Sequence, residues 1–97
     1  MGLLERRTVS RKTPGDGRLE ITKRAAARLG RDARLEVEIG GERTAATVGT
    51  MRCTCRGADN PHEHYFLESP ALKRLTPGTE VDLQLDAEGV VRVQEER

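Results

Sequence analysis

Two stretches of the chain carry the same succession of apolar residues and turns at a constant spacing. Residues 21–47 align with residues 67–93 at a shift of 46 positions and without a gap. The match runs through a short helical pattern, in which Leu29 corresponds to Leu75, and through alternating strand patterns beside it. Any alternating strand matches another at some shift. An ungapped match through a helix, its flanking strands and a turn favours a true pseudo-repeat.

The repeat constrains the fold because neither half can bury its apolar face alone. We therefore predict one domain, residues 1–97, built from pseudo-repeats at 3–47 and 49–93. Each half has the order strand, turn, strand, short helix, strand, and Thr22 and Ser69 are expected to cap the two helices. The expected strands comprise residues 3–10, 18–21, 35–39, 43–48, 51–55, 62–66 and 81–85, and the expected helices residues 23–29 and 70–75.

The core of this chain must be small and aliphatic. Hydrophobic residues make up 35% of the sequence, and the only aromatic residues are Tyr65 and Phe66. Two halves without long helices favour a small closed barrel, which also removes exposed strand edges. The predicted fold class is mainly β, a β-barrel with two short helices and with pseudo-duplicated strand-strand-helix-strand halves.

One part of the first half resembles a known family. Residues 17–23 read Gly-Arg-Leu-Glu-Ile-Thr-Lys, Leu29-Gly30 follows, and residues 35–39 alternate. This pattern resembles the half-barrel of AbrB/MazE-type transcription factors, and Gly15-Asp16 is similar to the turn of related cradle-loop barrels, which include double-psi barrels. The resemblance implies a barrel with a basic, DNA-facing surface. This chain departs from the family by carrying both halves, and by having Thr22 where a proline is usual.

Both cysteines and both histidines lie within twelve residues, in the pattern C-x-C, six residues, H-x-H. Two thiolates and two imidazoles form a tetrahedral zinc set. We predict one structural zinc per chain, held by Cys53, Cys55, His62 and His64. The alternative is two inert thiols and two surface histidines that merely lie close together. A disulfide is disfavoured, because same-face neighbours on a strand lie near the upper limit of Cα separation for that bond.

The same motif predicts an antiparallel hairpin in the second half. We expect Cys55 to lie opposite His62, and Cys53 opposite His64. Residues two apart on a strand share a face, so one face of the hairpin would carry all four ligands. A twist or a bulge would be needed to bring them within reach of one ion. The hairpin would thus be clasped by the metal.

A closed coordination sphere argues against catalysis, because a zinc enzyme keeps one position open for water. Glu63 is expected on the opposite face of the strand, so it is a poor general base. Asp59 or Glu63 could complete a catalytic site if only three ligands bind, and Cys55 with His62 could act as a nucleophilic pair. A zinc-dependent hydrolase is therefore the least favoured alternative, and we do not expect an enzyme.

The net charge of +1 hides an asymmetry along the chain. Residues 1–34 contain ten Lys and Arg against four Asp and Glu, whereas residues 35–97 contain seven against twelve. A basic half favours a polyanionic partner. An ordinary solvated charged surface is the alternative.

We predict that nucleic acid binds through the basic half, in a regulatory role such as transcription regulation. Arginine suits phosphate groups and guanine edges. The scarcity of aromatic residues argues against single-strand binding by base stacking, which leaves duplex DNA or structured RNA. The candidate nucleic-acid-binding residues are Arg6, Arg7, Arg11, Lys12, Arg18, Lys23, Arg24 and Arg28.

A protein–protein interaction module with a structural zinc hairpin is the main alternative function. The acidic second half could bind a basic partner or the basic half of another copy, so a homodimer is possible. The sequence contains no run of about eighteen apolar residues, and the first residues lack an apolar signal-peptide core, so no membrane association is expected. Reduced thiols and a cytoplasmic location are the expectation.

Overall fold

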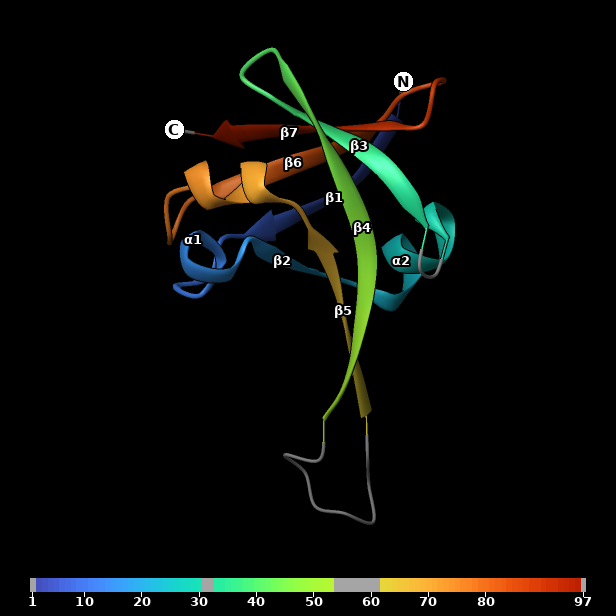
Figure 1. Cartoon of the computed structure of the whole chain (residues 1–97), viewed down its shortest axis with the longest axis vertical. Coiled ribbons are helices and arrows are strands. Elements are labelled where there is room, and N and C mark those ends of the chain that lie inside the picture. The colour runs from blue at the N-terminus through green and yellow to red at the C-terminus, as the bar shows by residue number, and fades with distance from the viewer. Residues whose placement is uncertain (1, 31–32, 54–61, 97) are drawn as a thin grey trace.

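A computed structural model describes residues 2–30, 33–53 and 62–96 of the chain. In this part the protein is mainly β, as predicted, and a seven-stranded sheet curls into a nearly closed barrel (Figure 1). The strand order is β1-β6-β7-β3-β4-β5-β2. The elements are β1 (Gly2–Thr8), α1 (Thr13–Asp16), β2 (Arg18–Ile21), α2 (Lys23–Leu29), β3 (Arg34–Ile39), β4 (Glu42–Cys53), β5 (His62–Glu68), the 3₁₀ helix η1 (Pro70–Arg74), β6 (Glu80–Leu85) and β7 (Val90–Glu96).

The two predicted helices form where their capping residues lie. Thr22 precedes α2, and its side-chain hydroxyl accepts a hydrogen bond from the Ala25 N–H at 3.1 Å. Ser69 caps η1 by accepting from the Ala71 N–H, and its own hydroxyl donates to the Ala45 carbonyl of β4 at 3.0 Å. The second cap therefore also ties its helix to the sheet.

The helix α1 was not expected, because its residues read as a turn. It has only four residues and ends at Gly17, whose φ of 69° is left-handed. The hydroxyl of the buried Thr13 donates to the Arg18 carbonyl at 2.7 Å. This bond turns the chain directly from α1 into β2.

The strand β4 is longer than predicted. The sequence suggested separate strands at residues 43–48 and 51–55, whereas β4 runs without interruption for twelve residues. Its first half pairs with β3 and its second half with β5, so the pairing continues along the whole strand. In Figure 1 the far ends of β4 and β5 extend beyond the rest of the barrel.

The core lies inside the barrel and is aliphatic, as the composition required. Five of its leucines are fully buried, and each contributes about 1.5–3 kcal/mol relative to an exposed side chain. Strand residues alternate between core and outside; on β5, for example, Leu67 is fully buried while its neighbours are only partly covered. The fully buried leucines are Leu19, Leu67, Leu72, Leu75 and Leu83.

The predicted full closure of the barrel is not reached. β1 and β2 are the two ends of the strand order, and no backbone ladder joins them in the described part of the chain. Side chains bridge this seam instead: the Glu5 carboxylate accepts from the Thr22 N–H at 3.0 Å, and Arg7 Nε donates to the Glu20 carbonyl at 3.0 Å. Side chains of β1 thus bind a backbone carbonyl of β2 and the backbone N–H that follows this strand, and the barrel is nearly closed.

The predicted hairpin of the second half is present, but its predicted register is wrong by two residues. Cys53 lies opposite His62 and Met51 opposite His64, instead of Cys55 opposite His62 and Cys53 opposite His64. Core packing explains the difference. In the observed register the buried Leu67 lies opposite the buried Val48, whereas a slip of two would set this leucine against an exposed threonine.

No helix among the described residues is long and apolar enough to cross a membrane.

Candidate functional site

The outward face of β2, β5 and β4 carries the candidate site. Strand register brings residues of the three strands together on this face: Glu20 lies opposite Phe66, Phe66 opposite Gly49, and His64 opposite Met51. The residues between them, such as Leu19 and Leu67, point into the core. The same alternation that fills the barrel therefore places a mixed polar and apolar set on its outside.

A cavity of about 550 Å³ lies between this face and the segment that links β1 to β2; we call it the hairpin groove. Cations come from the linking segment and from the start of β2, and apolar side chains come from β4 and β5. Such a lining suits a ligand that is both anionic and partly apolar. The lining residues are Ser10, Arg11, Lys12, Asp16, Arg18, Glu20, Met51, His64 and Phe66.

His64 of β5 and Glu20 of the neighbouring strand β2 form a pair on one wall of this groove. His64 Nδ1 lies 2.6 Å from Glu20 Oε2, and both side chains are partly exposed. The ring of His64 also lies against Phe66, at 6.4 Å between ring centroids. The carboxylate and the neighbouring ring together set the orientation of the imidazole.

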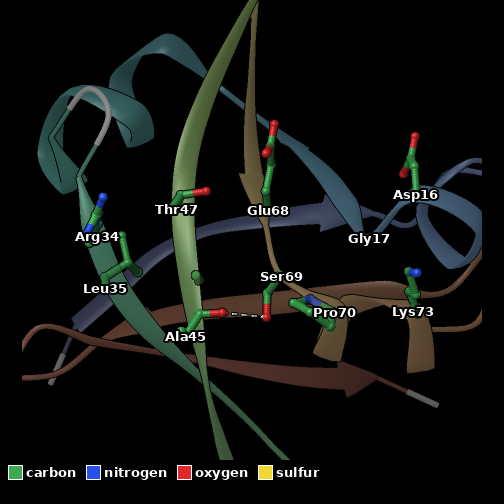
Figure 2. A pocket seen from close by; sticks show the side chains of 11 residues that line it. Asp16, Gly17, Arg34, Leu35, Ala45, Thr47, Glu68, Ser69, Pro70 and Lys73 are labelled. Atoms are coloured by element: carbon green, nitrogen blue, oxygen red, sulfur yellow. Dashed lines mark hydrogen bonds between the residues drawn. The ribbon is translucent and has the colours of Figure 1, made fainter.

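A second cavity, of about 450 Å³, adjoins the hairpin groove; we call it the η1 groove. Figure 2 shows Arg34 and Leu35 on one side of β4, and Asp16 and Lys73 on the other. Thr47 and Glu68, which are register partners, lie between them. The remaining lining residues are Gly17, Ala45, Ala46, Ser69 and Pro70.

An ion pair marks the boundary between the two grooves. Arg18 Nε, in the hairpin groove, lies 3.3 Å from Glu68 Oε1, in the η1 groove. The Glu68 carboxylate lies over Gly49, at the place that a β-carbon of residue 49 would occupy. Asp16 lines both grooves and accepts a hydrogen bond from the Arg18 N–H at 3.0 Å. The two grooves thus form one continuous surface.

The predicted nucleic-acid-binding residues divide into three groups. Arg11, Lys12 and Arg18 meet in the hairpin groove. Lys23, Arg24 and Arg28 lie on α2, exposed, at the other end of β2. Arg6 and Arg7 lie on β1 and hold the sheet together. Arg6 Nε lies 2.7 Å from Asp82 Oδ1 on the paired strand β6, and Arg7 bridges the seam to β2.

The predicted metal ligands are only partly described. His64 lies in the hairpin groove, and the backbones of Cys53 and His62 are the last β4–β5 register pair. Cys55 lies outside the described residues. Among the residues that the structure describes, no three or more His, Cys, Asp or Glu side chains form a group that could hold a metal ion. The zinc set stays a prediction.

Several groove residues were missed by the sequence reasoning. Met51 and Phe66 were expected only as strand residues, Arg34 lies in the basic half but was not among the candidate binding residues, and Lys73 lies outside that half. The alternation of β4 and β5 could have indicated Met51 and Phe66, because both share a face with His64. No sequence signal indicates Lys73, since η1 is brought to the groove by the tertiary fold.

No protein-family model, no curated protein and no solved structure matches the chain.

Proposed function

We propose that this protein is a nucleic-acid-binding module, and that the outward face of β2, β5 and β4 contacts the phosphate backbone. One observation carries the proposal: cations that make no ion pair within the described residues lie at both ends of this face. Arg11 and Lys12 line the hairpin groove, and Arg34 and Lys73 line the η1 groove. A polyanion laid along the face would meet positive charge at each end.

The carboxylates of the same face are already engaged. Glu20 is paired with His64, Glu68 with Arg18, and Asp16 accepts the Arg18 N–H. The negative charge of Glu68 is partly compensated by Arg18, and Arg7 Nη2 lies 3.9 Å from the Glu20 carboxylate. Arg11, Lys12, Arg34 and Lys73, which have no ion-pair partner in the described part of the chain, are the groups best able to exchange counterions for phosphates.

Double-stranded nucleic acid fits this face better than a single strand. Single-strand binders stack successive bases on exposed aromatic rings. In the described part of the chain the only aromatic ring on this face besides the His64 imidazole is Phe66, which is partly covered. Duplex DNA or structured RNA, recognised through its backbone, is the proposed partner, and a regulatory role such as transcription regulation is the proposed context.

A salt titration tests the proposal. Binding of a fluorescent duplex of random sequence should be measured by anisotropy over a range of salt concentrations. We expect association at low salt and a linear fall of log K with log salt, with a slope of about −0.9 for each phosphate contacted. Absence of binding at low salt would reject the function, because phosphate contacts are strongest there.

We further propose that a zinc ion held by Cys53, Cys55, His62 and His64 stabilises the β4–β5 hairpin. Two observations support it. The β4–β5 ladder extends as far as the Cys53–His62 pair, and the carboxylate of Glu20 holds Nδ1 of His64. Metal-binding histidines commonly carry such a carboxylate on the second ring nitrogen, and the ion then binds at Nε2.

The pseudo-duplication and the relationship to AbrB/MazE-type half-barrels also stay proposals. The β2–β5 pairing supports the pseudo-duplication. At the shift of 46 positions, Leu19 corresponds to Tyr65 and Ile21 to Leu67, so the pair Leu19–Leu67 corresponds to the pair Tyr65–Ile21. Both pairs occur. The halves differ elsewhere, since β4 and β5 are paired whereas β1 and β2 are not.

A further inference from the structure

Met51 is one of two large apolar side chains that are strongly exposed in the described part of the chain, at 46% relative exposure. It lies on β4 where that strand leaves the barrel, and it lines the hairpin groove together with Phe66. The other such residue, Leu3, is 55% exposed on β1 and lines neither groove. An isolated exposed apolar residue needs no explanation. The apolar pair Met51 and Phe66 does need an explanation, because three cations border it: Arg11, Lys12 and Arg18.

We propose that Met51 and Phe66 contact the 5-methyl groups of thymine in the major groove of duplex DNA. This inference rests on the proposed function and adds a base contact to it. Charge complementarity selects the occupant, because the cations beside the apolar pair match phosphates rather than a neutral hydrophobic partner. Among the groups that bases expose in the major groove, the thymine methyl is the apolar one.

The chemistry of the two side chains suits this contact. Methionine is unbranched and adapts to an irregular apolar surface. The ring of Phe66 lies against the ring of His64, and the Glu20 carboxylate binds Nδ1 of that imidazole. The flexible side chain of Met51 thus lies beside the oriented ring of Phe66. Arg18, in the same groove, is held by Glu68 and restricts where the neighbouring phosphate can lie.

The test compares two duplexes that differ only in this methyl group. One carries thymine and the other carries uracil at the same positions of a random-sequence pool. We expect the protein to bind the uracil duplex about fourfold more weakly for each methyl group contacted. Met51→Gln should reduce the preference for thymine and leave only the contribution of Phe66, because glutamine has a similar length but a polar end. The salt dependence of binding should stay unchanged in this variant.

Leu3→Gln is the matched control, since it replaces the other exposed apolar residue at a distance from the groove. It should keep the preference for thymine. Uracil also changes duplex flexibility, so the contrast between the two variants decides the outcome. Equal affinity of the wild-type protein for both duplexes, or a preference that Met51→Gln leaves undiminished, would overturn the inference while leaving the proposed function intact. Tighter binding of duplex RNA would also overturn it, whereas absence of all binding would reject the proposed function itself.

Discussion

The imidazole of His64 lies 2.6 Å from the carboxylate of Glu20 and so links β5 to β2, the strand at one edge of the sheet. This pair lies in the hairpin groove, beside Arg11 and Lys12. The sequence reasoning separated these residues, assigning stability to the Cys and His hairpin and ligand contact to the basic half. In the structure His64 and the basic residues border one cavity. We therefore expect metal binding and nucleic-acid binding to influence each other.

Zinc content is the first prediction. We expect the purified protein to contain about one zinc per chain by elemental analysis, and we expect Cys53→Ser to lose the metal and to lower the melting temperature. Glu20→Gln should keep the metal but weaken its binding by about 10- to 100-fold, because it changes the group that orients His64. Thr50→Ser is the control for Cys53→Ser, because Thr50 is an exposed residue on the same strand, β4. Wild-type protein without zinc would contradict the metal proposal.

Phosphate contacts are expected at the η1 groove as well as at the hairpin groove. Arg34→Gln and Lys73→Gln should each lower duplex affinity and reduce the magnitude of the salt slope by about 0.9, since each removes one exposed cation. Arg43→Gln serves as the comparison, because Arg43 lies at the β3–β4 end of the barrel, 3.5 Å from Glu88. Anisotropy titrations at several salt concentrations measure all three. If Arg43→Gln loses as much duplex affinity as Arg34→Gln and Lys73→Gln, the effect of charge is not local to the η1 groove.

Gly17 is predicted to be intolerant of a side chain. Its φ of 69° is left-handed, and a β-carbon there would lie 2.7 Å from the Ser69 carbonyl oxygen. Gly17→Ala should therefore destabilise the protein by at least about 1–2 kcal/mol from the backbone conformation alone. Gly15→Ala is the matched control: no atom lies within 4 Å of the added β-carbon, and the residue is helical. Alanine at 15 should leave stability unchanged or raise it slightly. Urea denaturation of both variants would reveal the difference.

Asp86 is predicted to make stability depend on pH in the acid range. The hydrogen bond from the Val90 N–H lowers the pKa of the Asp86 carboxyl below the usual 3.8. Burial raises this pKa, whereas the Glu88 N–H, Arg92 and Arg43 lower it further. A lowered pKa in the folded state stabilises the protein above the unfolded pKa, and this stabilisation is lost as pH falls through the folded value. Asp86→Asn should be less stable than the wild type at neutral pH, with the difference shrinking below about pH 4. A difference that stays constant with pH, in denaturation curves, would show that the charge of Asp86 is not responsible.

The local elements followed from short-range chemistry. Thr22 and Ser69 cap the helices predicted for them, and residues 18–21 form the strand that their alternation indicated. The β3–β4 turn forms at Gly40 and Gly41, both with positive φ. These features depend on neighbours in the chain, so the sequence alone was enough to place them. The mainly β fold class followed from the same patterns.

Long-range pairing was decided only by the tertiary structure. The register that sets Met51 against His64 depends on Leu67 meeting Val48 in the core, and a slip of two residues preserves every local alternation. The seam between β1 and β2 depends likewise on where Glu5 and Arg7 reach across the barrel. The two grooves combine residues from α1, β2, β3, β4, β5 and η1, and no pattern within one segment indicates that these residues meet. The sequence by itself therefore determined the two capped helices and the short alternating strands, and the packing of the barrel determined the length of β4 and which side chains share a surface.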